Sequence, residues 1–209
     1  MSRLRRALFA GCAGWLGLRA WASVRPAAFP YFGWPVLDIP RPLITRRGLL
    51  EILDPLAGER ILEVGPGTGY YTLPVAARLE RAGALEILDV RQSFLDQTVR
   101  RARRRGLTNV VPKLGDGRSL PFPSSCFDAA CLITVLGELP NPQAALGELR
   151  RVLKPAGRLV VGEILIDPDF TTFRWLVRHA RAASLLLERR TGTPAGYFAR
   201  FKAEANATK

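Results

Sequence analysis

The glycine-rich stretch ILEVGPGTGYY at positions 61–71 constrains the fold of this chain more than any other feature. Apolar, strand-favouring residues lead into it, three glycines alternate within it (Gly65, Gly67 and Gly69), and an apolar helical pattern follows. Because glycine takes positive φ without a steric penalty, the pattern predicts a buried strand, a tight turn and the start of a helix. The missing side chains would also let a ligand approach the backbone beside the free N–H groups of the helix N-terminus.

Two acidic residues indicate what kind of ligand this turn would hold. A related loop with the spacing GxGxxG seats a pyrophosphate. Here the spacing is GxGxG, and Glu63 stands two residues before the first glycine, where a carboxylate suits a ligand carrying an ammonium and a sulfonium better than a polyphosphate. Asp89 follows 20 residues after the last glycine and ends the apolar run LEIL. From that position it could accept hydrogen bonds from both hydroxyls of a ribose.

Residues from about 60 to 163 resemble a class I S-adenosylmethionine-dependent methyltransferase of the small-molecule and lipid-quinone type. ILEVGPGTG is similar to the first motif of that family, and Asp89, followed by Val90, matches its ribose-binding acid. The segment GDGRSLPFPSSCFD at 115–128 resembles the third landmark, in which an acid contacts the adenine amino group; Asp116 occupies that place, with Gly117 beside it. The resemblance implies S-adenosylmethionine as the cofactor.

The segment 135–163, VLGELPNPQAALGELRRVLKPAGRLVVGE, resembles the helix and strand that follow in the family. Many relatives carry histidines in the loop after the fourth strand, whereas this chain has Gly137 and Glu138, so a histidine-dependent role does not carry over. Thr134 belongs to the same strand end and is a candidate cofactor contact. Glu138 is the candidate acid or base facing the substrate, with an exposed loop carboxylate as the alternative; Glu163 and Asp167 are weaker candidates.

Strand and helix patterns alternate along the core, which predicts a Rossmann-like α/β fold. The expected strands cover 60–64, 85–89, 109–114, 127–135 and 157–165, and the expected helices cover about 70–82, 93–105, 142–153 and 170–183. Two last runs, at 184–191 and 196–202, flank TGTPAG and predict a closing antiparallel hairpin. With this hairpin we expect the chain to be complete. The resemblance implies a seven-stranded, mostly parallel sheet with helices on both faces. Right-handed crossovers would bring the glycine loop, Asp89, Asp116 and residues 134–138 to one sheet edge.

The acceptor is not readable from the sequence. Methyl transfer from a sulfonium depends chiefly on alignment and exclusion of water, so an oxygen, nitrogen, sulfur or carbon acceptor remains possible. The (N/D)PP(Y/F) tetrad of amino-group methylation is absent after the fourth strand, where LGEL stands instead. The glycine-rich loop with paired aspartates of the sister aminopropyl transferases is not visible either. The leading hypothesis is a small-molecule or lipid-like acceptor.

The formal net charge of +13 raises nucleic acid as an alternative partner. The densest run, VRRARRRG at 99–106, falls on an expected outer helix and lacks interleaved aromatic residues for stacking on bases. Nucleic-acid binding is therefore the weaker hypothesis, in the form of an RNA-directed methyltransferase or a non-catalytic module that binds S-adenosylmethionine. No metal site is predicted, because Cys12, Cys126 and Cys131 lack metal-ligand spacing and the single histidine, His179, sits inside a helical pattern.

The chain divides into a tail, a bridge and a methyltransferase domain. Residues 1–25 combine arginines with the apolar run ALFAGCAGWLGL, which fits a signal peptide, a short membrane span or an interfacial or lid helix. We favour the interfacial or lid helix, in a cytoplasmic protein peripheral to a membrane, because secretion would separate the enzyme from its cofactor; a frayed tail is the alternative. Residues 26–42, with five prolines and four aromatic residues, would fold back on the domain at 43–209 and help cover the cofactor or a flat apolar substrate. Packing alone would explain the aromatic residues equally well.

Overall fold

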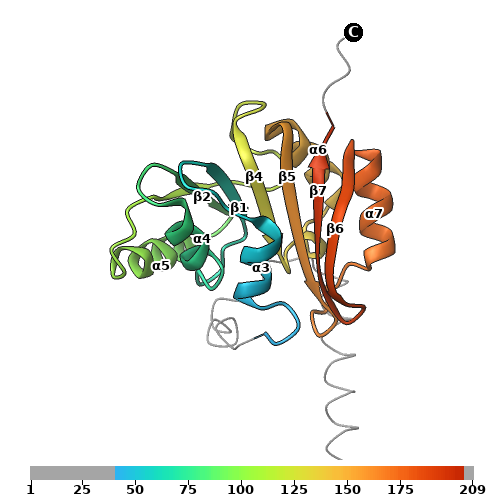
Figure 1. Cartoon of the computed structure of the whole chain (residues 1–209), viewed down its shortest axis with the longest axis horizontal. Helices are drawn as coiled ribbons and strands as arrows, with labels where there is room; N and C mark the ends of the chain where they lie inside the picture. Colours follow the sequence, from blue (N-terminus) through green and yellow to red (C-terminus); the bar gives the residue numbers. More distant parts are fainter. Residues whose placement is uncertain (1–40, 205–209) are drawn as a thin grey trace, which may run out of the picture.

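A computed structural model describes residues 41–204, which form a seven-stranded sheet in the order β3-β2-β1-β4-β5-β7-β6. Strands β1 to β5 run parallel to one another, and β7 is antiparallel to both β5 and β6. Figure 1 shows β2, β1, β4, β5 and β7 in this order from left to right. The strands are β1 (Arg60–Val64), β2 (Ala84–Asp89), β3 (Val110–Leu114), β4 (Phe127–Ile133), β5 (Leu153–Ile164), β6 (Leu185–Thr193) and β7 (Gly196–Ala203). The predicted fold class is confirmed.

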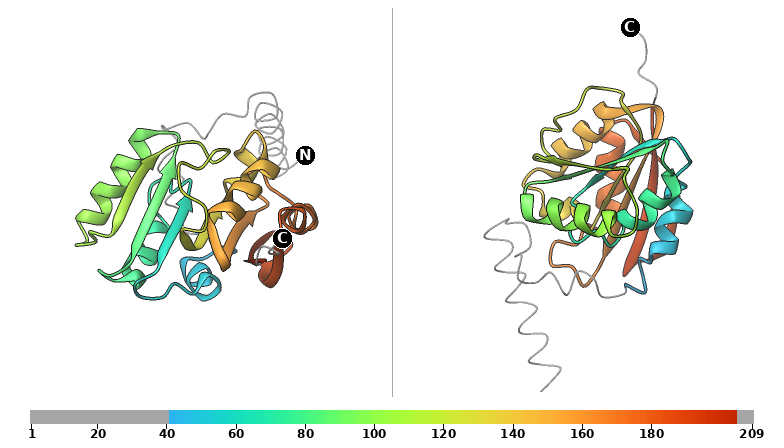
Figure 2. Two further views of the ribbon diagram at one scale, coloured as in Figure 1. Left: turned by 90° about the horizontal axis from the view of Figure 1, so that it is seen from above. Right: turned by 90° about the vertical axis from the view of Figure 1, so that its left-hand side faces the viewer.

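Helices cover both faces of the sheet, which is why the central strands are apolar on both sides. Three helices pack on one face, α3 (Arg46–Leu53), α4 (Thr72–Leu79) and α5 (Gln92–Arg103), and two on the other, α6 (Pro142–Val152) and α7 (Phe173–Ala182). A short 3-10 helix, η2 (Leu136–Glu138), links β4 to α6. In Figure 2, α3 and α6 lie on opposite sides of the sheet. Each face therefore carries its own hydrophobic core.

Local capping explains where several helices begin. Asn141 caps α6, since its side-chain oxygen accepts a hydrogen bond from the Ala144 N–H at 3.0 Å, and Pro142 occupies the first helical position. Thr172 caps α7 in the same way, so that helix starts at Phe173 rather than near 170 as predicted. The helix expected from about 70 starts at Thr72, because the glycine turn extends through Tyr71.

The fifth strand is longer than predicted at its beginning. It starts at Leu153, which pairs with Phe127, and a register irregularity in β4 lies between Phe127 and Ala129. The closing hairpin of β6 and β7 is confirmed, with β7 filling the position between β5 and the edge strand β6. This hairpin places Tyr197 and Phe201 in the core beside α7.

The predicted tail at 1–25 and nearly all of the bridge at 26–42 lie outside the described residues. Within residues 41–204, no helix is long and apolar enough to cross a membrane. The arginine run lies on α5 and the turn after it, as expected. Arg101, one arginine of this run, contacts the rest of the domain, because its guanidinium donates a hydrogen bond to the Thr68 carbonyl at 2.8 Å.

Candidate active site

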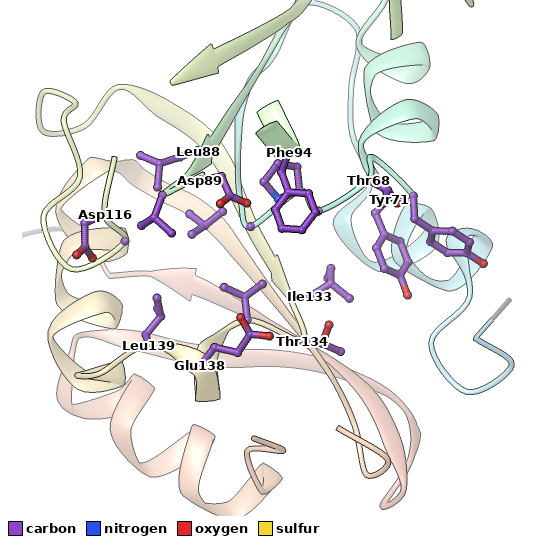
Figure 3. Close-up of a pocket in the computed structure, with 18 of the residues that line it drawn as sticks. Thr68, Tyr71, Leu88, Asp89, Phe94, Asp116, Ile133, Thr134, Glu138 and Leu139 are labelled. Carbon is purple, nitrogen blue, oxygen red and sulfur yellow. The ribbon is translucent and has the colours of Figure 1, made fainter. Parts of the chain in front are cut away.

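The carboxyl ends of the parallel strands enclose a cavity of about 250 Å³. Its wall contains most of the predicted site residues, namely Gly65, Gly67, Asp89, Val90, Asp116, Gly117, Thr134 and Glu138. Figure 3 shows Asp116, Asp89, Phe94 and Tyr71 following one another along the cavity, with Glu138 pointing into it from the opposite side. The sheet topology thus brings together residues that are up to 73 positions apart in the sequence, from Gly65 to Glu138.

The glycine turn is built so that only glycine fits. Gly65 and Gly67 have φ angles of 70° and 54°, in the left-handed region. A Cβ on Gly65 would lie 2.4 Å from Cγ2 of Val135, so the end of β4 packs directly on this backbone. The Thr98 hydroxyl fixes the far side of the turn from α5, donating a hydrogen bond to the Gly67 carbonyl at 3.0 Å. The bare backbone of the turn forms one wall of the cavity.

Asp89 ends β2, and its carboxylate is held by backbone N–H groups that follow it in the chain. Its Oδ1 accepts a hydrogen bond from the Arg91 N–H at 2.9 Å, which fixes the carboxylate at the cavity wall. Burial raises the pKa of Asp89, while hydrogen bonding to the Arg91 backbone acts in the opposite direction. The neighbouring Val90 lines the same wall and is 54% exposed, so its side chain offers an apolar surface to a flat ligand.

Asp116 lies at the other end of the cavity and is held by Arg118. The Arg118 Nε–H donates to Asp116 Oδ2 at 2.9 Å, and the Arg118 backbone N–H donates to Oδ1 at 2.8 Å. These hydrogen bonds lower the pKa of Asp116, so its carboxylate stays ionised and ready to accept. A Cβ added at Gly117 beside it would lie 3.4 Å from side-chain atoms of Val64 and Leu139, an ordinary contact distance.

Thr134 connects the cavity to the strand behind it. Its φ of 56° is unusual for a residue other than glycine, and such backbone strain is concentrated at functional sites. Its N–H donates a hydrogen bond to the Gly162 carbonyl of β5 at 2.8 Å, which holds the strand end in place. The chain then turns into η2 and presents Glu138 to the cavity.

Glu138 sits in an unusual electrostatic setting for a cavity residue. Burial raises the pKa of Glu138 to about 8, helped by the carboxylates of Asp167, Asp169 and Asp89, while Arg91 acts in the opposite direction. Burial also raises the pKa of Asp167 to about 6. A carboxyl group that titrates near neutral pH suits general acid–base work.

Two predicted residues do not reach the cavity wall. Glu63 is 3% exposed inside β1, and its register partners are Ile87 on β2 and Cys131 on β4. Burial raises the pKa of Glu63 to about 7. Gly69 faces Thr98, since a Cβ there would lie 3.0 Å from Cγ2 of that threonine. Glu63 and Gly69 therefore support the turn from behind instead of lining the site.

Sequence reasoning missed one end of the cavity, which Arg41 forms together with Tyr70 and Tyr71. The Arg41 guanidinium lies 5.6 Å from both tyrosine ring centres. Tyr71 is fixed by its hydroxyl, which donates to the Ile44 carbonyl at 2.6 Å. Arg41 is the only cation that lines the cavity in the described part of the chain. Arg41 belongs to the bridge at 26–42, which the sequence predicts to fold back on the domain and help cover the cofactor, but no pattern singled out this arginine.

Phe94 is a second missed residue. It lies on α5 two residues after the helix starts, is 4% exposed and lines the cavity beside Asp89. Figure 3 places its ring near the middle of the cavity. In the sequence it is indistinguishable from the other apolar residues of the α5 core face. His179, in contrast, stacks on Trp175 at 3.8 Å between ring centres within α7 and takes no part in the cavity wall.

The residues present fit S-adenosylmethionine. Two carboxylates, Asp116 and Asp89, and the cation Arg41 line the same cavity, and a ligand with an adenine amino group, a ribose and a carboxylate offers groups that suit them. The glycine turn lets that ligand approach the backbone beside the start of α4. The fold and the site together define a class I S-adenosylmethionine-dependent methyltransferase domain.

Comparison with known proteins places the chain in the same family. Residues 61–157 match the family described as a methyltransferase domain. The demethylmenaquinone methyltransferase of Tropheryma whipplei (strain Twist) is 38% identical over 156 residues, which covers 73% of this chain and 61% of the relative. The nocamycin O-methyltransferase of Saccharothrix syringae is 33% identical over 113 residues, covering 54% of this chain and 40% of the relative. The chain belongs to the class I S-adenosylmethionine-dependent methyltransferases, so the family recognised in the sequence is confirmed.

A solved structure shows the same fold over nearly the whole domain. The S-adenosylmethionine-dependent methyltransferase from Aquifex aeolicus superposes with a TM-score of 0.76 at 19% identity, covering 84% of this chain and all of that one. The chain spans about 40 to 60% of the length of the first curated relatives it matches. S-adenosylmethionine is the cofactor of the family; the acceptor differs between its members.

Proposed function

We propose that this protein transfers the methyl group of S-adenosylmethionine to a small-molecule or lipid-like acceptor. The observation that carries the proposal is the convergence of the glycine turn, Asp89, Asp116 and Glu138 on one cavity. S-adenosylmethionine supplies an electrophilic methyl group on a sulfonium when it is bound. The protein needs to bind it, align the acceptor and exclude water.

The order of the residues along the cavity supports one orientation of the cofactor. Asp116 would accept from the adenine amino group, and the Asp89 carboxylate would accept from the ribose hydroxyls. The bare backbone of Gly65 and Gly67 would lie against the centre of the molecule. Arg41, at the tyrosine end, would hold the methionine carboxylate, since arginine pairs well with carboxylates.

Glu138 is the proposed proton acceptor. Its side chain enters the cavity from the side opposite Asp89, which leaves room for an acceptor between Glu138 and the cofactor wall. In its ionised form the carboxylate would take the proton that an acceptor hydroxyl or amine loses on methylation. The positive sulfonium would favour that ionised form, because an opposite charge lowers the pKa of a carboxyl group.

The cavity wall on this side supports an apolar acceptor. Ile133 and Leu139 line it, and Leu165 and Ile166 are 46% and 73% exposed in the loop after β5. The names of the relatives point to aromatic or lipid-like acceptors, a quinone precursor in one and nocamycin in the other. We propose an acceptor of this general class.

The binding of the cofactor is tested by calorimetric titration of S-adenosylmethionine into the full chain and into Asp89→Ala. We expect micromolar binding that is lost in the variant. Asp96→Ala is the matched control, because Asp96 is an exposed acid on α5 that accepts only from Gln92. Absence of binding to the unmodified protein would overturn the proposed function. With binding shown, turnover is screened with quinols, phenols and lipids.

We further propose that residues 1–25 and the bridge at 26–42 cover the cavity or contact a lipid surface. Arg41, the first described residue, lines the cavity and belongs to the bridge segment 26–42. A chain lacking residues 1–25 should keep its affinity for S-adenosylmethionine, because every described cavity residue is retained. Its turnover of a lipid-like acceptor and its flotation with anionic vesicles should fall. Unchanged turnover and flotation would contradict this role.

A further inference from the structure

The loop after β5, residues 165–172, exposes its apolar residues and partly buries its acids. Leu165 and Ile166 are 46% and 73% exposed, whereas Asp167 and Asp169 are half-buried. Asp167 Oδ1 accepts a hydrogen bond from the Asp169 N–H at 2.9 Å, which folds the acidic part of the loop back on itself. Because apolar side chains are normally covered and carboxylates normally solvated, this reversed arrangement indicates a surface that meets an apolar partner.

The loop is held in this arrangement by the elements around it. Glu163, which is 1% exposed and does not line the cavity, accepts a hydrogen bond from the Thr171 N–H at 3.2 Å. The Tyr197 hydroxyl donates to the Thr171 carbonyl at 2.7 Å. The Leu165 N–H donates to the Ala195 carbonyl, in the turn between β6 and β7, at 2.8 Å. The exposure of the two apolar side chains is therefore a property of the folded domain.

Two further apolar residues extend this surface. Leu43 is exposed and lies against the β6–β7 turn, since a Cβ on Gly196 would lie 2.4 Å from Leu43 Cβ. Pro194 is exposed in the same turn. Figure 1 shows the end of β5, the β6–β7 turn and the segment before α3 along the lower edge of the domain. We call Leu43, Leu165, Ile166 and Pro194 the apolar rim.

The apolar rim borders the cavity through two of its segments. Arg41, which lines the cavity, stands two residues before Leu43. The loop after β5 packs on η2, since a Cβ on Gly137 would lie 1.7 Å from the Asp169 carbonyl oxygen, and Gly137 is followed by the cavity residue Glu138. A partner on the apolar rim would therefore lie beside the proposed acceptor side of the cavity.

Arginines accompany the apolar rim. Arg174 is exposed in the first turn of α7, directly after the loop. Arg190 is exposed on β6, and its guanidinium lies 4.3 Å from the ring centre of Phe173 at the start of α7. Neither arginine forms an ion pair within residues 41–204. Arginines beside exposed apolar side chains are typical of surfaces that bind anionic lipid.

The combination of groups distinguishes between polyanionic partners. A nucleic acid would pair with the arginines but would offer no apolar interior to Leu165 and Ile166. A bilayer with anionic lipids offers phosphates to the arginines and acyl chains to the apolar side chains. The formal net charge of +13 favours the same partner.

We propose that the apolar rim inserts into the surface of an anionic lipid bilayer, with Arg174 and Arg190 at the headgroup phosphates. A lipid-like acceptor could then pass from the bilayer to the cavity without crossing water. This passage rests on the proposed function, whereas the contact between the apolar rim and the bilayer does not.

The test places a fluorescent reporter in the apolar rim of the full chain. Ile166→Trp is mixed with vesicles of phosphatidylcholine and phosphatidylglycerol in equal parts, with brominated acyl chains as quenchers. Leu186→Trp is the matched control, because Leu186 is 43% exposed at the other end of β6. After subtraction of the signal of the unmodified protein, we expect quenching of Ile166→Trp and none of Leu186→Trp. Equal responses of the two variants would overturn the proposal.

A measurement without vesicles distinguishes a bilayer from a protein occupant. Acrylamide in water should quench Ile166→Trp strongly, because the position is exposed. Shielding from acrylamide would mean that protein covers the apolar rim, and this result would overturn the proposal. The mass in gel filtration would then show whether the covering protein is a second copy or a segment of the same chain.

The arginines are tested by removing the same charge at two places. Arg174→Gln combined with Arg190→Gln should weaken binding to the anionic vesicles at least about tenfold. Arg103→Gln combined with Arg104→Gln on the exposed end of α5 is the control and should weaken it less. Equal losses would contradict the placement of Arg174 and Arg190 at the lipid.

The outcome for the apolar rim is separable from that for the proposed function. Leu165→Ser combined with Ile166→Ser should bind the vesicles about tenfold or more weakly. Its Kd for S-adenosylmethionine, measured without vesicles, should stay unchanged. Failure of the unmodified protein to bind S-adenosylmethionine would contradict the proposed function, whereas an unquenched Ile166→Trp would contradict only this inference.

Discussion

The carbonyl oxygen of Asp169 occupies the space that a side chain at Gly137 would need. A Cβ on Gly137 would lie 1.7 Å from that oxygen. Because the clash is with backbone atoms, rotation of a side chain cannot relieve it. Gly137 thus lets the loop after β5 close against η2, and this contact brings Asp167 and Asp169 toward Glu138.

Gly137→Ala should therefore destabilise the protein and reduce turnover. Overpacking of this kind costs about 1–3 kcal/mol, which corresponds to a fall in Tm of roughly 2–4 °C per kcal/mol for a domain of this size. Gly147→Ala on α6 is the control, since a Cβ there meets nothing within 4 Å and alanine favours a helix. A Gly137→Ala protein with the same Tm as the control would show that the loop moves freely.

Gly65→Ala should weaken binding of S-adenosylmethionine. The added methyl would meet Val135 Cγ2 at 2.4 Å in a backbone with a φ of 70°, so the turn must shift. Gly58→Ala is a matched control with a φ of 84° and open space around the added Cβ. We expect the Kd to rise about tenfold or more in Gly65→Ala only, equivalent to about 1.4 kcal/mol. Equal Kd values in the two variants would argue against close approach of the ligand to Gly65.

Arg41→Gln should weaken binding through the loss of one charge-assisted contact to the methionine carboxylate. A hydrogen bond to a charged group contributes about 1.5–3 kcal/mol, so calorimetry should show a Kd at least about tenfold higher. Arg47→Gln serves as the control, because the Arg47 side chain is 89% exposed and pairs only with Glu51 on the surface of α3. With decarboxylated S-adenosylmethionine, Arg41→Gln and the unmodified protein should bind equally; a persistent difference would assign Arg41 to another contact.

Glu63 should make stability depend on pH. Its pKa is raised from 4.5 to about 7 by burial, so the folded state holds this proton more tightly than the unfolded state. The stabilisation is fully present below pH 4.5 and is lost as pH rises through about 7, for a total of about 3 kcal/mol. Urea unfolding from pH 5 to 8 should show Glu63→Gln gaining stability relative to the unmodified protein as pH rises. Glu51→Gln, at an exposed position, should show no such trend. A pH-independent difference for Glu63→Gln would contradict the buried ionisable state.

Local sequence patterns were sufficient to predict the fold and to bring the carboxylates of Asp89 and Asp116 to one edge of the sheet. The strands at 60–64 and 85–89 were readable because parallel strands buried on both faces are short apolar runs bounded by turns. Asp89 and Asp116 both lie at the cavity, as expected, because Asp89 ends β2, Asp116 comes two residues after β3, and parallel strands end at one edge of the sheet. The less accurate boundaries, such as the start of β5 at Leu153, depend on pairing with a distant strand.

The sequence by itself determined the order of strands and helices, the turn that only glycine can form and the carboxylates at the strand ends. These features depend on backbone sterics and on periodicity over a few residues. The tertiary structure decided that Arg41 and Phe94 reach the cavity and that Glu63 does not. The burial of a side chain, and its interactions with charged groups that are distant in the sequence, arise only when the sheet and loops pack together. A local sequence pattern therefore cannot predict them.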